Sequence, residues 1–421
     1  MLDLKFIREH ADEVRKGIEA KGLTVNLGEI LKLDERRRTL IQEGETLKAK
    51  RNEATAHVAR MKSRGENADA IIREMETTKA GIQATDRELH DAESKLDALM
   101  LTVPNIPHPS VPVGKTPAEN REIHRWGDPP SVDFPLKPHW EIAEKLGIID
   151  FSRGAKVSGA GFPFYVGKGA TLERALINFF LDQATARGYR EISPPVLVNE
   201  ESARGTGQLP DKEDLMYTAD RDGLYLIPTA EVPVSNFHRD EILSEGDLPV
   251  RYAAYTPCFR REAGSYGKDV RGLNRVHQFD KVELVKFVHP SSSYDELESL
   301  RRDAETLLES LGLPYHTLLM CTGDMGFTQT KKYDLEVWAC GQGRWLEVSS
   351  CSNFEAFQAR RMRVRFKPGN GGKAEFVHTL NGSGLALPRV VAAILEQYQT
   401  PEGKVIVPKI LHSYTKFEII G

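Results

Sequence analysis

The sequence FRREAGSYGKDVRGLNRVHQFDKVE, at residues 259–283, is the stretch that best indicates the fold of this chain. Arg260 and Glu262 stand two residues apart, so on a strand both side chains point to one face. After a glycine-rich segment the alternation resumes, with Phe279 and Lys281 on one face of a second strand. The pattern predicts an antiparallel hairpin with a cationic tip. The alternative is an exposed hairpin whose charged turn is simply solvated.

The segment between the two strands combines glycine with positive charge. Gly264, Gly267 and Gly272 would let the backbone close over a ligand, because glycine adopts conformations closed to other residues. Lys268 and Arg271 would then face an anion. A nucleotide with a small charged substrate beside it fits this layout.

Length, charge and cysteine content limit the classes of protein to consider. A chain of 421 residues is long enough for two or three domains, and its net charge of −4 restricts any nucleic-acid contact to a local patch. We find no signal peptide and no apolar run long enough to span a bilayer, which predicts a cytoplasmic protein with no membrane partner. The cysteines lack CxxC spacing and are expected to be reduced thiols; they are Cys258, Cys321, Cys340 and Cys351.

The distribution of aromatic residues indicates a domain boundary. No Phe, Tyr or Trp occurs between Phe6 and Trp126, whereas aromatic residues are frequent afterwards. A proline-rich stretch at residues 104–117 reads as the linker. We therefore predict a helical-hairpin domain over residues 1–110 and a second domain over residues 111–421.

The first domain has the heptad pattern of a long antiparallel coiled-coil arm. A turn at residues 63–67 separates its two helices. Residues 32–64 carry ten Lys or Arg and five Asp or Glu, whereas residues 65–100 carry four and nine, so opposite net charges favour pairing. The expected apolar seam consists of Ile30, Leu33, Leu40, Leu47, Ala54, Val58 and Met61 in the first helix, and Ala68, Ile71, Met75, Thr78, Ile82, Thr85, Leu89, Ala92, Leu96 and Leu99 in the second.

Three basic residues, Arg60, Lys62 and Arg64, lie next to the predicted turn of the arm. They fit a nucleic-acid surface, and they fit the solvated flank of a coiled coil equally well. The residues alone leave both interpretations open.

The second domain mixes short strands with helices. One helix is expected to begin after Thr171, which would be its N-cap. A second is expected at residues 294–311 and would end before Gly312. Strands are expected at residues 224–227, 256–260, 276–286, 334–338, 345–349, 362–366 and 374–378. Sequential hairpins predict an α+β fold with a mainly antiparallel sheet flanked by helices. The chain has neither a GxGxxG motif nor a Walker loop.

Several motifs, taken in order, resemble the class II aminoacyl-tRNA synthetases, and the whole chain resembles the bacterial seryl-tRNA synthetase family. RGYREISPPVLV at residues 187–198 resembles motif 1, with Pro195 at the dimer-interface proline. FRRE at residues 259–262 resembles motif 2, and GSGLALPR at residues 382–389 resembles motif 3, although Pro388 stands where the general class often has an acidic residue. TAE at 229–231, VHQFDKVE at 276–283 and EVSSCS at 347–352 resemble the serine branch.

The resemblance implies a set of site residues. The implied L-serine-binding residues are Thr229, Ala230 and Glu231, with Glu283 and Ser383 at the side-chain hydroxyl. The implied ATP-binding residues are Arg260, Arg261, Glu262, Val276, Phe279, Glu347, Val348, Ser349, Ser350 and Arg389. Arg260 would hold the α-phosphate and Arg389 the γ-phosphate, both as catalytic residues, while Glu347 and Ser350 would ligate Mg²⁺.

Three of these residues have a plainer alternative. Phe279 could be core packing, and Glu347 an ordinary strand carboxylate. Glu283 could be the salt-bridge partner of Lys281 or Lys286.

The resemblance also implies the reaction and its partners. The expected activity is that of an ATP-dependent serine–tRNA ligase that forms seryl-adenylate and pyrophosphate and then charges tRNA(Ser), with tRNA(Sec) as a further partner. The arm, with Arg60, Lys62 and Arg64, would grip the tRNA, and the protein would be a homodimer. The alternatives are another class II synthetase or a paralogue that aminoacylates a carrier protein.

Overall fold

The computed structural model describes residues 1–262 and 271–421. The expectations for Gly264, Gly267 and Lys268 lie outside the described residues. The chain folds into two compact units. One unit comprises Leu2–Glu19 and Leu23–Pro104, and the other comprises Met1, Ala20–Gly22 and Asn105–Gly421.

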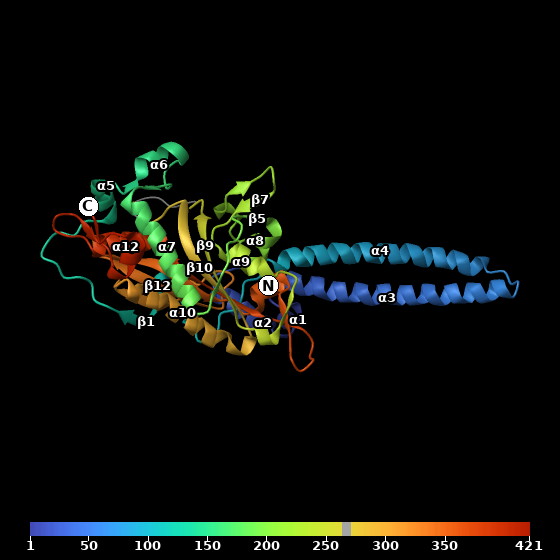
Figure 1. Ribbon diagram of the computed structural model, residues 1–421. Coiled ribbons are helices and arrows are strands. Elements are labelled where there is room, and N and C mark those ends of the chain that lie inside the picture. Colours follow the sequence, from blue (N-terminus) through green and yellow to red (C-terminus); the bar gives the residue numbers. More distant parts are fainter. Residues whose placement is uncertain (263–270) are drawn as a thin grey trace. The chain divides into compact units, whose positions relative to one another are not determined.

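The first unit is dominated by two long helices that lie side by side and antiparallel, α3 (Leu27–Ser63) and α4 (Asp69–Met100) (Figure 1). The short helices α1 (Leu4–Glu9) and α2 (Ala11–Ala20) precede them. Asn26 caps α3, since its side chain accepts a hydrogen bond from the Glu29 backbone N–H at 3.1 Å. We refer to α3 and α4 together as the arm.

The predicted heptad seam of the arm is confirmed. The expected seam residues of both helices are buried or half-buried, and Arg51, which interrupts the pattern, is exposed. Small residues allow close approach, because a Cβ on Gly44 would lie 3.7 Å from Thr85, and one on Gly81 would lie 3.6 Å from Leu47.

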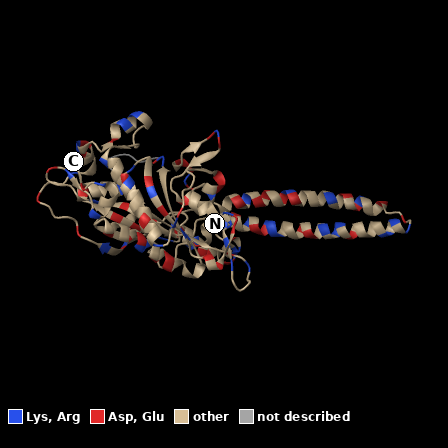
Figure 2. Cartoon of the chain, in the orientation of Figure 1, with Lys and Arg blue, Asp and Glu red and all other residues tan. Residues whose placement is uncertain are grey.

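Ion pairs also cross between the two arm helices, each with its basic member on α3 and its acidic member on α4. They join Arg36 to Glu88 at 2.8 Å, Arg37 to Glu93 at 3.1 Å, and Lys48 to Asp86 at 3.0 Å. Figure 2 shows the opposite charge bias of the two helices, as predicted from the sequence.

The second unit is built on an eight-stranded sheet of order β1-β11-β12-β13-β16-β10-β9-β4. Neighbours are antiparallel except for β4 and β9, so the predicted mainly antiparallel sheet is confirmed. Its strands are β1 (Arg121–Trp126), β4 (Arg190–Glu191), β9 (Val250–Phe259), β10 (Gln278–Val288), β11 (Tyr315–Leu319), β12 (Lys331–Ala339), β13 (Arg344–Asn353) and β16 (His378–Ala386).

Helices α7 (Lys168–Ala186), α10 (Ser293–Ser310) and α12 (Leu387–Gln397) pack on the sheet and form the main apolar core with it (Figure 1). Thr171 does not cap α7, contrary to prediction. Gly167, with φ of +53°, is the N-cap, and Thr171 lies in the first turn, where its hydroxyl donates to the Gly167 carbonyl at 3.3 Å. The helix therefore begins earlier than the side-chain pattern indicated.

The remaining elements are short. The helices are α5 (His139–Leu146), α6 (Phe151–Ser158), α8 (Glu200–Thr206), α9 (Glu231–Ser235), α11 (Ala356–Met362) and α13 (His412–Thr415). The strands are β2 (Ile149–Asp150), β3 (Phe164–Tyr165), β5 (Leu197–Asn199), β6 (Thr218–Ala219), β7 (Leu224–Leu226), β8 (Ile242–Ser244), β14 (Arg365–Lys367), β15 (Glu375–Phe376), β17 (Val405–Ile406) and β18 (Ile419–Ile420).

The strands predicted at residues 362–366 and 374–378 form a hairpin, because β14 and β15 pair antiparallel. Its first strand begins later than expected, since Met362 still ends α11. Among the described residues no helix is long and apolar enough to cross a membrane. All four cysteines are free, in line with the prediction of unpaired thiols.

Candidate active site

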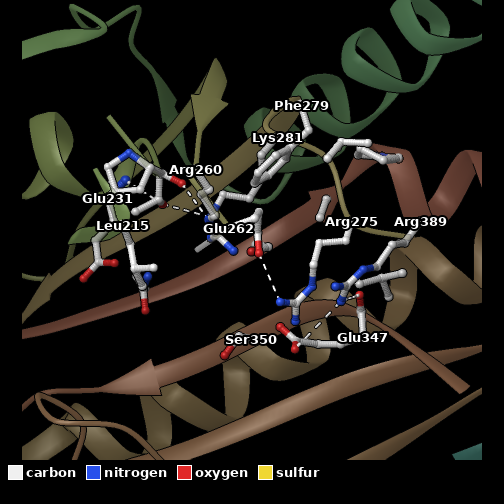
Figure 3. Close-up of a pocket in the computed structure, with 18 of the residues that line it drawn as sticks. Leu215, Glu231, Arg260, Glu262, Arg275, Phe279, Lys281, Glu347, Ser350 and Arg389 are labelled. Carbon is white, nitrogen blue, oxygen red and sulfur yellow. Dashed lines mark hydrogen bonds and ion pairs between the residues drawn. The ribbon is translucent and has the colours of Figure 1, made fainter. Parts of the chain in front are cut away.

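A cavity of about 520 Å³ opens among β10, β12, β13, β16 and the start of α12, next to the end of β9 (Figure 3). It gathers most of the residues expected at the serine and ATP sites, which the sequence scatters over residues 229–389. Those that line it are Thr229, Glu231, Arg260, Glu262, Val276, Phe279, Glu347, Val348, Ser350, Ser383 and Arg389.

Four expected residues are not among the lining residues of this cavity. Ala230 is fully buried in an apolar cluster, and Arg261 is exposed, with its backbone N–H donating to the Leu215 carbonyl. The Ser349 hydroxyl donates to the Ser383 carbonyl at 2.6 Å, which ties β13 to β16. Glu283 lies beneath the cavity with a buried side chain.

Arg260 directly follows β9, and Phe279 is the second residue of β10, so the two side chains lie in contact in the cavity wall. The Arg260 guanidinium carbon lies 5.1 Å from the centre of the Phe279 ring, within the range of a cation–π contact. Its Nε donates to the Pro228 carbonyl at 3.3 Å, and within the described residues its other guanidinium donors are left for a ligand. Phe279 is thus a face of the cavity and not part of the apolar core.

Arg389 lies in the first turn of α12, and two carbonyl groups orient its guanidinium. Nη1 donates to the Glu347 carbonyl at 2.7 Å, and Nε donates to the Asn274 carbonyl at 3.1 Å. The Glu347 carboxylate lies 3.9 Å from Nη1. Two backbone acceptors therefore orient the arginine, and the Glu347 carboxylate forms a longer ion pair with it.

Glu262 stands at the rim of the cavity in a left-handed backbone conformation, with φ of +48°. Its carboxylate pairs with Arg275 at 3.2 Å (Figure 3). A non-glycine residue in this conformation is uncommon and is found disproportionately at binding sites.

Two carboxylates, those of Glu347 on β13 and Asp334 on β12, lie respectively at and behind the floor of the cavity. Burial opposes ionisation of Glu347, but the charges of Lys332, Arg389, Arg260 and Lys281 hold its pKa below the usual value. Behind it, burial and the Glu347 charge raise the pKa of Asp334 to about 7, although Lys332 contacts that carboxylate at 3.0 Å.

Glu347 and Ser350 both line the cavity, so hard oxygen donors are available for Mg²⁺. The described residues contain no group of three His, Cys, Asp or Glu side chains suited to a metal. These two residues consequently fit a cation that takes its other ligands from phosphate and water, as Mg²⁺ does with nucleotides.

Thr229, Lys281 and Glu283 form a buried polar network at the opposite end of the cavity. Lys281 forms an ion pair with Glu283 and also donates to the Thr229 hydroxyl at 2.8 Å. The Thr229 hydroxyl donates to Glu283 Oε2 at 3.1 Å, and Asn381 donates to Oε1 at 3.0 Å. Of the two lysines considered as partners of Glu283, the structure selects Lys281, because Lys286 pairs with Glu296.

Glu231 is the first residue of α9, and its side chain is buried beside this network. Gln358 Nε2 donates to Glu231 Oε1 at 2.6 Å, and Thr379 fixes the Gln358 amide by donating to its oxygen at 2.8 Å. Burial and the nearby charge of Glu283 raise the pKa of Glu231 to about 7. A cationic ligand at this position would relieve that unfavourable burial of charge.

The same family is indicated by sequence and by structure. The family model "Seryl-tRNA synthetase N-terminal domain" matches residues 1–107, and "tRNA synthetase class II core domain (G, H, P, S and T)" matches residues 216–398. A serine–tRNA ligase of Salinibacter ruber is 55% identical over 425 residues, covering 100% of this chain and 99% of the relative. One from Geobacter sulfurreducens is 54% identical over 415 residues, covering 98% of each chain.

The chain belongs to the seryl-tRNA synthetase family.

Solved structures agree with this membership. A seryl-tRNA synthetase from Pyrococcus horikoshii, complexed with ATP, superimposes with a TM-score of 0.94 at 37% identity, covering 100% of this chain and 99% of that one. A cytoplasmic serine–tRNA ligase from Naegleria fowleri, in complex with AMP, gives 0.90 at 27% identity over 100% and 98%. The resemblance and the fold class predicted from the sequence are confirmed.

Several cavity residues of this chain were missed as site candidates. Lys281 lies on the same strand face as Phe279 and Glu283, so the alternation could have indicated it. Arg275, Lys332 and Asn381 line the cavity from three separate segments, and nothing in their local sequence marks them.

Proposed function

We propose that the chain activates L-serine with ATP in this cavity, forming seryl-adenylate and pyrophosphate, and then transfers serine to the 3′ end of tRNA(Ser). One observation carries the assignment of the site. A single cavity holds Arg389, oriented by two carbonyl groups at one end, and Arg260, which lies beside a buried threonine–lysine–carboxylate network at the other. This arrangement suits a polyanion next to a small zwitterion.

The chemistry requires the serine carboxylate to attack the α-phosphorus while pyrophosphate leaves. The carboxylate is already ionised, so no general base is needed. The barrier comes from repulsion between anions and from alignment, and fixed cations lower it. Arg260 would neutralise the α-phosphate and the incoming carboxylate, while Arg389 would meet the γ-phosphate. Phe279 would stack on the adenine, and Glu262 would stand at its edge. Val276 and Val348 line the same cavity, and Arg261 precedes Glu262 in the chain.

Serine recognition would depend on the buried network. Thr229 and Glu231 would receive the α-ammonium, with Ala230 between them. Glu283 and Ser383 would receive the side-chain hydroxyl. Alanine lacks that hydroxyl and would leave buried polar groups unpaired, so the site would reject it.

Mg²⁺ is part of the proposal because Glu347 and Ser350 offer the oxygen ligands it prefers. When bound, the cation would neutralise the triphosphate charge. Glu347 would hold it in the ionised form, which the surrounding cations favour. The buried Ser349 would act indirectly, by fixing β13 against β16.

The arm is proposed to hold the tRNA, tRNA(Sec) included. Arg60, Lys62 and Arg64 are exposed, and they form no ion pair within the described part of the chain, whereas Lys48 is paired with Asp86. Cations free of protein partners are the ones available to phosphates. We also propose that the boundary between the two domains lies between residues 110 and 111. We propose further that the protein is a homodimer and that it acts in the cytoplasm.

The test is ATP–pyrophosphate exchange with each proteinogenic amino acid in turn, followed by charging of tRNA(Ser). Exchange should depend on serine and exceed that with alanine or threonine by about two orders of magnitude or more. Exchange driven by another amino acid, or no exchange with serine at all, would refute the proposal.

A further inference from the structure

A buried histidine–glutamate pair lies just outside the cavity. His139 begins α5 and Glu396 lies in the last turn of α12, and both side chains are 0% exposed. His139 Nδ1 lies 2.8 Å from Glu396 Oε1. Neither residue is among those that line the cavity.

Glu396 collects hydrogen bonds from two different segments. Oε1 accepts from the His139 backbone N–H at 2.9 Å and from Gln342 Nε2 at 2.7 Å. Oε2 accepts from the backbone N–H of Gly341 at 2.9 Å and of Gln342 at 3.2 Å. One buried carboxylate thereby joins the start of α5 to the turn between β12 and β13.

The far side of the histidine ring contacts the segment that leads into β10. The Leu273 backbone N–H donates to His139 Nε2 at 2.8 Å. Gly272, with φ of +64°, packs so closely on the ring that a Cβ there would lie 2.2 Å from Nε2. Both the left-handed conformation and the close approach call for glycine at this position.

This contact fixes the state of the imidazole. Nε2 accepts a hydrogen bond, so it carries no proton itself, and Nδ1–H donates to Glu396. The ring thus joins a donor on one side to an acceptor on the other.

The same segment reaches the phosphate end of the cavity. Asn274 Nδ2 donates to Gln342 Oε1 at 2.8 Å, while the Asn274 carbonyl accepts from Arg389 Nε at 3.1 Å. Leu273 and Asn274 both line the cavity. Two chains of contacts, through His139 and through Gln342, therefore run from Glu396 to residues 272–274 and on to Arg389.

We propose that His139 and Glu396 are positioning residues for ATP. They hold residues 272–274 against the cavity wall, and the Asn274 carbonyl in turn holds the Arg389 guanidinium in place. Neither residue touches the substrate. The inference rests on the proposed function, since it assigns this end of the cavity to the triphosphate.

Two substitutions of His139 separate positioning from general stability. An asparagine amide takes roughly the place of Nδ1 and leaves the Leu273 N–H unpaired, whereas the longer glutamine can place its oxygen near Nε2. His139→Asn should raise the KM for ATP about tenfold, with the KM for serine unchanged. His139→Gln should bring the KM for ATP back to within about threefold of wild type.

A matched control is available at His316, another buried histidine held by two carboxylates, Glu122 at 3.0 Å and Glu336 at 2.7 Å. It is not a cavity residue. His316→Asn should lower the melting temperature and leave both KM values at wild type. Serine-dependent exchange by the wild-type protein is measured first, so loss of the proposed function would be seen separately.

Equal KM values for ATP in His139→Asn and His139→Gln would overturn the proposal, as would a parallel rise in the KM for serine. If His139→Asn does not fold, Gln342→Ala provides the same test through the Asn274 contact. It should raise the KM for ATP about threefold, and an unchanged value would contradict the inference.

Discussion

The arm and the cavity both depend on paired charges, but in opposite settings. In the arm, the side chains of Arg37 and Glu93 are 34% and 42% exposed. In the cavity, those of Lys281 and Glu283 are 6% and 1% exposed. Water screens the first pair, so its contribution to stability is small, whereas the second cannot lose one member without leaving a buried charge uncompensated. Charge therefore guides pairing in the arm, whereas in the cavity it forms a buried network that we propose as part of the serine site.

The largest effect is expected on breaking the buried pair. Lys281→Met should lower the free energy of unfolding by about 3–5 kcal/mol, because Glu283 stays buried without its cation. Chemical denaturation measures this change. A loss below about 1 kcal/mol would place this pair in the same class as the exposed pairs of the arm.

Removing an oriented arginine should affect catalysis and not folding. Arg260→Ala and Arg389→Ala should each reduce kcat for serine-dependent exchange about 10²–10³-fold, the effect of losing one oriented donor to a developing charge. Arg36→Ala, in the arm, is the matched control and should leave exchange intact. Exchange at the wild-type rate in either cavity variant would contradict the assignment of phosphate contacts.

Shortening the arm should separate the two half-reactions. The helices face each other at Gly44 and Thr85, so residues 46–84 can be replaced by a short Gly/Ser linker without disturbing the Arg37–Glu93 pair. Exchange should continue, since the main apolar core lies within residues 142–420. The kcat/KM for tRNA(Ser) should fall about 100-fold as phosphate contacts are lost.

The three tip cations can be tested without shortening the arm. Neutralising Arg60, Lys62 and Arg64 together should weaken tRNA binding and flatten its salt dependence, whereas Lys48→Ala, at a paired lysine, should have less effect. If the protein with the shortened arm, described above, charges tRNA(Ser) as well as wild type does, the arm is a structural element only.

The pH dependence of serine use should report Glu231. The carboxyl must be ionised to receive an ammonium, so kcat/KM for serine should fall as pH drops through about 7, by about tenfold one unit below. Glu231→Gln should have a low kcat/KM that is flat across this range. A wild-type profile that is flat from pH 6 to pH 8 would show that the group does not titrate there.

The stability of the folded chain should change with pH in the opposite direction to kcat/KM. The folded-state pKa of Glu231 is raised from 4.5 to about 7, so its protonated form contributes stability below pH 4.5, and this contribution is lost as pH rises through 7. The melting temperature of wild type should therefore fall relative to Glu231→Gln as pH increases across that window. A constant difference between the two proteins would contradict the shift.

The smallest effect is expected at the exposed pair of the arm. Arg37→Met should change the free energy of unfolding by less than about 1 kcal/mol, and 1 M salt should reduce the change further. A double-mutant cycle with Glu93→Gln measures the coupling. A coupling as large as that of Lys281 and Glu283 would remove the contrast between the two regions.

The same contrast explains how far the sequence could predict the structure. The arm was predictable in detail, because a seven-residue period places Leu40 and Leu89 in one seam without reference to distant residues. The hairpin of β9 and β10 was predictable from its two-residue alternation. Both patterns depend on neighbours in sequence.

The missed residues depend on tertiary structure. Asn381 meets Glu283 only because β16 lies next to β10, and Gln358 reaches Glu231 across 127 residues of sequence. The start of α7 was misplaced because Gly167 ends the preceding segment by its backbone conformation, which the side-chain pattern does not encode. The periodicity of the sequence does not encode contacts between residues that are far apart in the chain.

The most direct test of the central claim is a crystal structure of the chain with a non-hydrolysable seryl-adenylate analogue. We predict the α-phosphate mimic against the Arg260 guanidinium, the adenine on Phe279, and the ammonium within hydrogen-bonding distance of Thr229 and Glu231. An analogue bound in the reverse orientation, with its adenine beside Glu231, or bound outside this cavity, would contradict the claim.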